Sequence, residues 1–286
     1  MSYGLALGGG GVVGIAWEIG VLAGLEDKGI DVGGAAVVVG TSAGSVVGAQ
    51  LLLGRTLSDL MAQQREPEGL AAASAGPPDL NALTEIFQLW GGADEMTPEL
   101  VRQVGELALR AKTAPEEGWV AGFEQLIGTS EWPAGDLRVA AVDCTTGERR
   151  VWTAASGVDL QRAVASSCAV PGLFPPVTIG GTRYTDGGVW SGSNADVVSG
   201  AGVSAAVFVG PLVGDTGIAR VSGRTLERER ATLADAGITL VTIVPGPDFR
   251  VPDLNLMDPG RREWAVEIGL ADGREAAGRV AEAVGG

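Results

Sequence analysis

One stretch of the sequence, residues 33–54, carries no charged side chain over 22 residues, and this restricts how it can be buried. By length alone it could cross a bilayer. However, it contains six glycines, and a Gly-Thr-Ser-Ala-Gly run at 40–44 interrupts its middle. The continuous apolar run at 35–39 favours a strand buried on both faces, followed by a sharp turn and a buried helix through Leu53. We therefore predict a strand, a turn and a helix here instead of a membrane span.

A similar unit starts the chain. Residues 5–7 form a short apolar segment that runs into four consecutive glycines, and apolar side chains then recur at helical spacing from Gly14 to Leu25. This pattern predicts a strand, a glycine loop and a helix. Two such units in succession indicate an α/β fold, in which helices cover a parallel sheet.

The middle of the chain has a different character. From Arg55 to Trp132 the sequence shows helical and loop signals separated by prolines, with no convincing strand. We expect a helical insertion over about 55–135 that covers the site. We expect one domain over residues 1–286, because a chain of this length can bury a single large core. The remaining elements are predicted as strands at 137–142, 151–153, 205–210 and 239–244, a hairpin over 175–184 that turns on Gly180 and Gly181, and helices at 226–236 and 261–284.

The charge of the chain restricts its partners. Lys+Arg 20 against Asp+Glu 35 gives a net charge of −15, which repels nucleic-acid phosphates and anionic lipid. We expect no nucleic-acid partner and only transient contact with a membrane or micelle. The N-terminus lacks the features of a secretory signal, so a cytoplasmic location is expected. Cys144 and Cys168 lack metal-ligand spacing, so we expect free thiols and no metal site.

The chain contains no histidine, which limits the serine chemistry it can perform. Ser42 lies midway between Gly40 and Gly44, a nucleophile-elbow pattern whose glycines permit a tight turn from strand to helix. Without an imidazole, the base for this serine must be a carboxylate. The best candidate is Asp186, which ends an extended segment and is followed by the glycines 187–188. Burial beside these glycines is expected to raise the pKa of Asp186 toward neutrality.

The first glycine loop permits two interpretations. Gly9, Gly11 and Gly14 fit the G-x-G-x-x-G fingerprint of dinucleotide-binding oxidoreductases. Such a site needs an acidic residue at the end of the second strand, but Asp31 precedes that strand and the serine turn occupies its end. Alternatively, the backbone amides of Gly9, Gly10 and Gly11 form an oxyanion hole. The second interpretation fits the sequence better, and the oxidoreductase remains the less favoured alternative.

The motifs, taken together and in this order, resemble those of the patatin-like phospholipase family, and of its bacterial members in particular. Residues 7–14 resemble the glycine-rich oxyanion loop of the family, residues 40–44 its nucleophile elbow, and the Asp-Gly-Gly run at 186–188 its dyad motif. Residues 169–176 are similar to the segment that precedes the dyad aspartate. The resemblance covers residues 3–210.

This resemblance implies a three-layer α/β/α sandwich around a mostly parallel sheet. It also implies hydrolysis of acyl esters of lipids or lipid-like molecules by a dyad of Ser42 and Asp186, with no metal and no cofactor, and the motif glycines Gly187 and Gly188 beside the aspartate. An acyltransferase shares every motif and passes the acyl group to an alcohol instead of water. A binding protein with an unreactive Ser42 also keeps the fold.

Two positions depart from the family pattern. Val13 stands where the family commonly has Arg or Lys, so the glycine loop lacks a cation that could attract a lipid phosphate. After the dyad motif, many members have Asn-Asn-x-Pro, whereas this chain has residues 190–196, in which Asn194 is the counterpart of that turn. The sequence therefore does not decide between a phospholipid and a neutral ester.

Other residues are interpreted mainly as structural. Asp143 ends a predicted strand before Thr and Gly, which is typical of a turn. Trp17 follows the glycine loop by about one helical turn and is the best tryptophan for an acyl pocket, whereas Trp90 and Trp190 are expected in core or lid packing. Three small side chains upstream of the linker are candidates for lining an acyl channel, namely Ser166, Ser167 and Cys168.

Overall fold

The computed structural model describes residues 2–66, 78–215, 217–249 and 255–285. Within these residues, eight strands form one sheet in the order β5-β6-β3-β2-β1-β7-β8, and β4 also pairs with β3. Neighbours among β1, β2, β3, β7 and β8 are parallel, whereas β4, β5 and β6 run antiparallel to their partners. The predicted, mostly parallel sheet is confirmed. The strands are β1 (Tyr3–Leu7), β2 (Val37–Thr41), β3 (Leu137–Asp143), β4 (Arg149–Trp152), β5 (Val177–Ile179), β6 (Thr182–Asp186), β7 (Ala205–Val209) and β8 (Thr239–Ile243).

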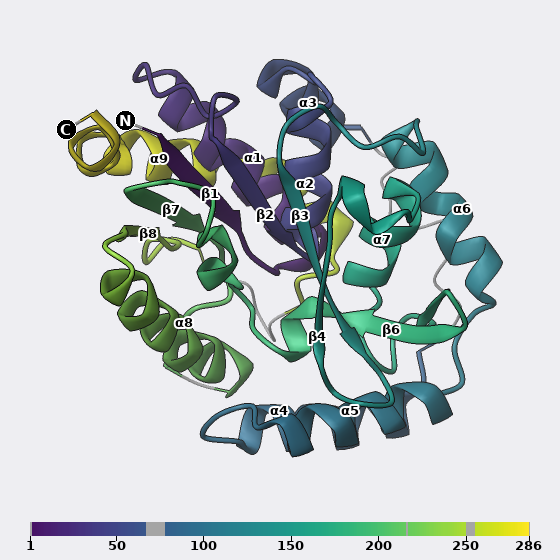
Figure 1. Cartoon of the computed structure of the whole chain (residues 1–286). Helices are drawn as coiled ribbons and strands as arrows, with labels where there is room; N and C mark the ends of the chain where they lie inside the picture. The colour runs from purple at the N-terminus through teal and green to yellow at the C-terminus, as the bar shows by residue number, and fades with distance from the viewer. Residues whose placement is uncertain (1, 67–77, 216, 250–254, 286) are drawn as a thin grey trace.

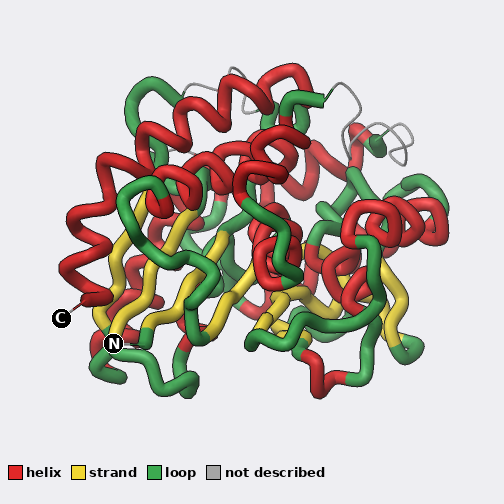
Figure 2. The backbone as a smooth tube through the Cα atoms, turned by 90° about the horizontal axis from the view of Figure 1, so that it is seen from above, coloured by secondary structure: helices red, strands yellow, loops and turns green. Residues whose placement is uncertain are grey.

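Helices cover both faces of this sheet (Figures 1 and 2). Successive side chains of a strand point to opposite faces, and the two buried clusters follow this alternation. Leu5, Leu7 and Val207 pack in one cluster, whereas Ala6 and Phe208 pack in the other. The first cluster includes side chains of α1 (Gly11–Glu26), α2 (Ala43–Leu52) and α9 (Arg262–Gly285), and the second includes side chains of α8 (Gly217–Asp235). The fold is therefore helix, sheet and helix in three layers.

The 33–54 stretch forms β2, a turn and α2, as predicted. None of the described helices is both long and apolar enough to cross a bilayer. The helix predicted from Gly14 begins at Gly11, and the helix predicted at 226–236 begins at Gly217. Both helix starts contain glycine, which has a low helix propensity, so the sequence pattern does not mark them as helical.

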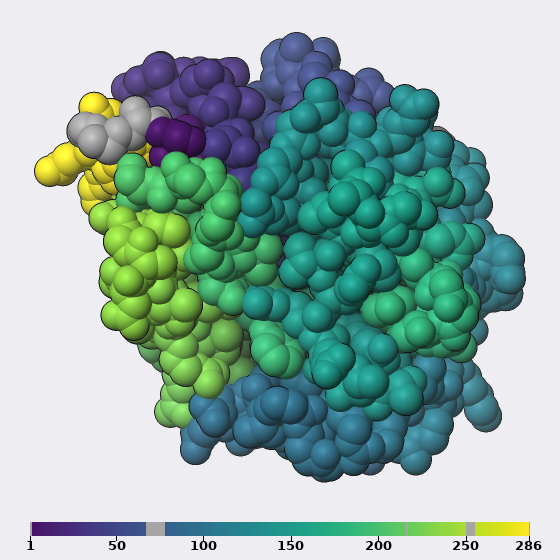
Figure 3. All heavy atoms as spheres, viewed as in Figure 1, coloured from purple at the N-terminus to yellow at the C-terminus, as the bar shows by residue number. Residues whose placement is uncertain are grey.

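The described part of the stretch 55–135 consists of helices joined by loops and contains no strand, and residues 67–77, which include two of the predicted proline breaks, lie outside the described residues. Thr56, Asp79 and Thr97 each accept a hydrogen bond from a backbone N–H in the first turn of the following helix, a typical N-cap. The helices are α3 (Leu57–Gln64), α4 (Leu80–Gly92), α5 (Pro98–Arg110) and α6 (Glu116–Ile127). Of these, α4 and α5 lie along the lower edge of the molecule in the view of Figures 1 and 3.

The helix that follows the glycine loop, α1, touches the C-terminal helix α9 backbone to backbone. Gly20 and Gly24 of α1 face Gly269 and Gly273 of α9, and each pair is spaced four residues apart on one helix face. A Cβ atom at Gly273 would collide with the backbone carbonyl of Val21. Because these glycines carry no side chains, the two axes can approach closely, and α9 fixes the helix that carries the glycine loop.

We expect Gly273→Ala to lower the free energy of unfolding by about 1–3 kcal/mol, because the added methyl group overpacks the helix contact. The matched control is Gly278→Ala in the same helix, where a Cβ meets nothing within 4 Å and where alanine should add roughly 0.5–1 kcal/mol through helix propensity. Urea unfolding of the three proteins measures both effects. Equal shifts for the two variants would contradict the close contact.

Candidate active site

Ser42 occupies a sharp turn between β2 and α2. Its φ of 51° lies in the left-handed region, which is uncommon for a residue with a side chain. A Cβ at Gly40 would collide with the backbone of Ser45, and a Cβ at Gly44 would collide with the carbonyl of Leu7. The glycines that frame the serine in the sequence are therefore required by the closeness of β1, β2 and α2.

Hydrogen bonds with the end of α7 (Leu160–Ser167) and with α2 itself hold the Ser42 backbone in this conformation. The Ser42 N–H donates to Ser167 Oγ (2.9 Å), at the end of α7. The Ser42 carbonyl accepts from Ser45 Oγ (2.7 Å) and from Cys168 Sγ (3.2 Å). Of the three predicted channel residues, Cys168 lines the pocket, Ser167 supports the turn, and Ser166 instead bonds to Trp152 Nε1 (3.1 Å) away from Ser42.

Pairing along β3 brings Asp186 to Ser42. β2 is parallel to β3 and places Thr41 opposite Ala140, whereas β6 is antiparallel to β3 and places Asp186 opposite Ala141. Because β4 pairs with residues 139–142 on the other side of β3, β2 and β6 share one side and their carboxyl-terminal ends point at each other. The side chains of Ser42 and Asp186 therefore meet at the junction of two strands.

Asp186 is almost fully buried, at 3% exposure. Burial raises the pKa of its carboxyl group to about 7, although the nearby Ser42 hydroxyl and the Gly188 N–H both lower it. Oδ1 accepts from the Gly188 N–H (2.7 Å), and Oδ2 is buried with no hydrogen-bond partner among the described residues. A Cβ at Gly187 would collide with the Ala140 carbonyl. The sequence-based expectation of a raised pKa is confirmed.

The glycine loop requires one correction. The Gly9 N–H already donates to the Gly192 carbonyl (3.0 Å), so it is not a free donor for an oxyanion. In the described part of the chain, the N–H groups of Gly10, Gly11 and Ala43 make no hydrogen bond. Ala43 was not singled out from the sequence, although its place directly after the nucleophile is the usual position of an oxyanion donor.

The same loop is held closely against its neighbours. The Gly14 N–H donates to the Gly10 carbonyl (2.8 Å), and a Cβ at Gly14 would lie 3.2 Å from Pro211 Cγ. Val13, which stands where the family commonly has a cation, is fully buried, and its N–H donates to the Leu256 carbonyl (3.0 Å). The loop is thus fixed by backbone contacts at this position.

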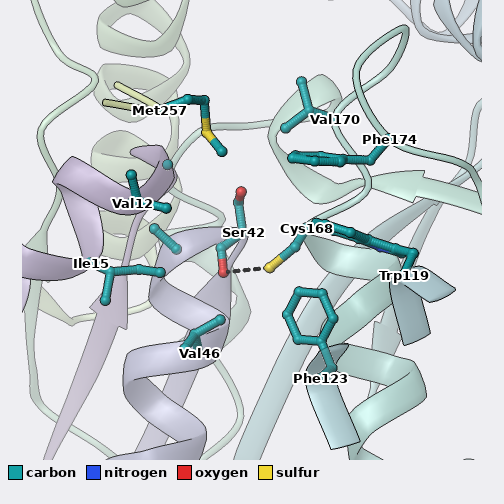
Figure 4. Close-up of a pocket in the computed structure, with 12 residues that line it drawn as sticks. Val12, Ile15, Ser42, Val46, Trp119, Phe123, Cys168, Val170, Phe174 and Met257 are labelled. Atoms are coloured by element: carbon teal, nitrogen blue, oxygen red, sulfur yellow. Dashed lines mark hydrogen bonds between the residues drawn. The ribbon is translucent and has the colours of Figure 1, made fainter. Parts of the chain in front are cut away.

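An apolar pocket opens beside Ser42 (Figure 4). Trp119 and Phe174 stack in one wall, with ring centroids 3.9 Å apart. None of the twelve described residues that line the pocket carries a charge. In sequence order the lining residues are Gly11, Val12, Ile15, Ser42, Ala43, Val46, Trp119, Phe123, Cys168, Val170, Phe174 and Met257.

The expectation that Trp17 lines the pocket is wrong. Its side chain is fully buried, its Nε1 donates to Asp272 Oδ2 (2.8 Å), and its ring packs against Phe249. The helical turn that separates it from the glycine loop places it toward α9. Trp90 packs in a buried cluster, as expected. Asp143 accepts from two backbone N–H groups in the loop after β3, so the predicted turn is confirmed.

The described residues contain no group of three or more His, Cys, Asp or Glu side chains arranged to hold a metal ion. The end of β2, where a dinucleotide site needs an acidic residue, is occupied by Thr41 and Ser42. The geometry instead joins a strained serine, a buried carboxylate, free backbone amides and an apolar pocket.

The family model described as patatin-like phospholipase matches residues 5–199, more than half of the chain. The chain belongs to the patatin-like phospholipase family. Among curated proteins, none matches the chain significantly.

Two solved structures of low identity are similar to this patatin-like chain. VipD from Legionella pneumophila gives a TM-score of 0.46 at 13% identity, over 97% of this chain and 66% of VipD. The type III effector protein ExoU gives a TM-score of 0.37 at 17% identity, over 96% of this chain and 53% of ExoU. The chain spans less than two thirds of the length of either protein.

The raised pKa of Asp186 predicts a pH-dependent cost in stability. The folded state retains a proton between about pH 4 and 7 that the unfolded chain releases, so this carboxyl group destabilises the fold increasingly as pH rises through that range. Asp186→Asn should therefore raise the free energy of unfolding by up to about 4 kcal/mol at pH 8 and by little at pH 3. Urea unfolding at both values measures this. Asp143→Asn is the control, and the same pH-dependent gain there would refute the assignment to Asp186.

Proposed function

We propose that this chain is a serine acyl-hydrolase that cleaves carboxylic esters of lipids or lipid-like molecules through an acyl-enzyme on Ser42. The observation that carries the proposal is the placement of Asp186 beside Ser42, with one buried carboxylate oxygen to which no other described residue donates a hydrogen bond. A buried acceptor of this kind is costly to leave unpaired, and here it lies close to the Ser42 hydroxyl, whose proton it could take during nucleophilic attack.

In the first half of the proposed reaction, Ser42 Oγ attacks the acyl carbonyl carbon and its proton passes to Asp186. With a pKa of about 7, this carboxylate is a stronger base than an ordinary aspartate and is still about half ionised at pH 7. The tetrahedral intermediate collapses when the proton passes from Asp186 to the leaving alkoxide. Ser42 then carries the acyl group.

In the second half, Asp186 takes a proton from water, the resulting hydroxide attacks the acyl carbon, and the proton returns to Ser42 Oγ as the acid leaves. In both halves the negative oxygen of the intermediate needs donors that are already in place. The amides of Gly10, Gly11 and Ala43 donate to no other described residue, and they lie at the N-terminal ends of α1 and α2, where helix dipoles favour negative charge. Gly9 is left out of this proposal.

The pocket supports a preference for an apolar acyl chain. Its lining is uncharged, and aromatic rings from α6 and from the 169–176 segment form one side of it. Nothing in this lining favours a phosphate, and Val13 supplies no cation near it. We propose that the acyl group, and not the head group, supplies most of the binding energy.

Reaction with a fluorophosphonate, followed by intact-protein mass spectrometry, tests the dyad. We expect one adduct on the wild type, none on Ser42→Ala, and modification at least about a hundredfold slower on Asp186→Asn, because the base is removed. Ser166→Ala and Asp143→Asn are matched controls that should react like the wild type. A folded wild type that forms no adduct would overturn the proposed function.

An acyltransferase requires the same dyad, so product analysis accompanies the labelling. Ester turnover in the presence of added alcohol acceptors separates the two activities, since a transferase yields a new ester and a hydrolase yields the free acid. A predominance of new ester at low acceptor concentration would replace hydrolysis with transfer and leave the roles of Ser42 and Asp186 unchanged.

The pocket predicts which substitution changes chain-length preference. Phe123→Ala removes a ring from the lining, so the ratio of kcat/KM for a dodecanoate ester over a butanoate ester should rise by roughly tenfold. Rates are normalised to the fraction of protein that the fluorophosphonate labels, which corrects for unfolded protein. Phe87→Ala, an exposed phenylalanine on α4 outside the pocket, is the control. An unchanged ratio for Phe123→Ala would place the acyl chain elsewhere.

A further inference from the structure

The segment that follows the dyad turn, Ser191–Asp196, contacts all three motifs of the site, and we call it the anchor segment. Its Gly192 carbonyl accepts from the Gly9 N–H of the glycine loop (3.0 Å). Its Ser191 N–H donates to the carbonyl of Gly187, directly after the dyad aspartate (3.1 Å). The anchor segment is thus joined to two of the motifs through the backbone.

Asn194 joins the anchor segment to the third motif. Its Nδ2 donates to Thr41 Oγ1 (3.0 Å), one residue before the nucleophile, and to the Ser191 carbonyl (2.7 Å). The Asn194 backbone is left-handed, with φ 45°, a conformation that asparagine tolerates better than most residues. The residue that replaces the family's Asn-Asn-x-Pro turn therefore fixes the end of β2 relative to the dyad turn.

Glu229 of α8 holds the anchor segment from the opposite side. Its side chain is buried, and its carboxylate accepts from Ser191 Oγ (2.7 Å), Ser193 Oγ (2.5 Å) and the Ala195 N–H (3.0 Å). Three donors from one segment converge on a single carboxylate. Removing such an acceptor leaves buried hydroxyl and amide groups unpaired, which is more disruptive than the loss of one surface hydrogen bond.

Two further charged groups face this cluster. Arg149 of β4 binds Asp196 through both terminal nitrogens (2.7 and 2.8 Å), and one of them also donates to Asn194 Oδ1 (3.2 Å). Burial is the main cause that raises the pKa of Glu229, and the negative charge of Asp196 adds to it, whereas the two serines and the Ala195 amide lower it. When Glu229 is protonated, the carboxylate that accepts these three hydrogen bonds becomes a carboxylic acid, which must itself donate one.

We propose that Glu229 is a positioning residue, whose ionised carboxylate holds the anchor segment and through it the relative placement of the glycine loop, Ser42 and Asp186. The proposal rests on the proposed function, because its effect is on the reaction of Ser42. It goes beyond the dyad because it assigns a role to Glu229, which lies on α8 and neither contacts Ser42 nor lines the pocket. Lowering the pH would protonate both Asp186 and Glu229, and each protonation would impair the site.

The first test compares Glu229→Gln with Glu227→Gln, an exposed position on the same helix that pairs with Arg230. Glu229→Gln keeps the size of the side chain but replaces one acceptor oxygen by a donor. We expect fluorophosphonate modification at pH 8 to slow by about tenfold, as small displacements of reacting groups do, with little change in the KM for an ester because the pocket is untouched. Glu227→Gln should match the wild type. Equal modification rates for Glu229→Gln and the wild type would overturn the proposal.

A double-mutant cycle tests whether Glu229 acts through the anchor segment. Asn194→Ala removes the link to Thr41, and if both residues act through one structure, the double variant should react no more than about threefold more slowly than the slower single variant. If the rate reductions of the two single variants instead multiply in the double variant, Glu229 does not act through the anchor segment. If Glu229→Gln does not fold, Ser193→Ala takes its place, since it removes one of the three donors and leaves the charge. An unchanged rate there would equally refute the proposal.

The pH profile supplies a readout that a purely structural role would not move. In the wild type, loss of activity below neutrality should involve two protons, so the slope of log kcat/KM against pH should approach about two, and in Glu229→Gln it should approach about one. The same slope in both proteins would contradict the inference. A wild type that the fluorophosphonate does not label would instead refute the proposed function, so the two failures are distinguishable.

Discussion

The burial of the Asp186 carboxylate is the constraint on which the other features of the site depend, because a buried charge is costly. In a chain without histidine, an aspartate can act as a base near neutral pH only if its ionised form is made less favourable, and burial does this. The carboxylate receives one backbone hydrogen bond, from Gly188, which orients it without fully stabilising its charge. A second donor to Oδ2 would lower the pKa and weaken the base. The unpaired oxygen is therefore consistent with the chemistry proposed for Ser42.

Residues beyond the matched family segment complete the site. The family match ends at residue 199, yet Met257 lines the pocket and the Leu256 carbonyl accepts from Val13 in the glycine loop. α9 packs against α1 through glycines on both helices. α8 contributes Glu229 to the segment that joins the three motifs. The C-terminal part of the chain therefore supports the geometry of motifs that lie far earlier in the sequence.

How much the sequence predicts depends on the range of the interaction concerned. The uncharged run at 33–54 predicts a strand, turn and helix because local patterning decides between them, and chemistry and composition single out Ser42 and Asp186 as the candidate dyad. Trp17 is assigned wrongly, because helical spacing does not show which neighbour a helix face will meet. The stacking of Trp119 on Phe174, and the use of the Gly9 amide by Gly192, join segments that only the folded chain brings together. Glu229 carries no motif and could not have been found by pattern.

The distance between Ser42 and Asp186 is set by neither of the two turns that carry them. It is set by consecutive residues of β3, because Ala140 pairs with the end of β2 and Ala141 pairs with the end of β6. For a designer who wishes to graft this dyad onto another scaffold, the transferable unit is therefore three strands and their register. Two loops copied onto a sheet without that shared central strand would reproduce the residues and lose their spacing.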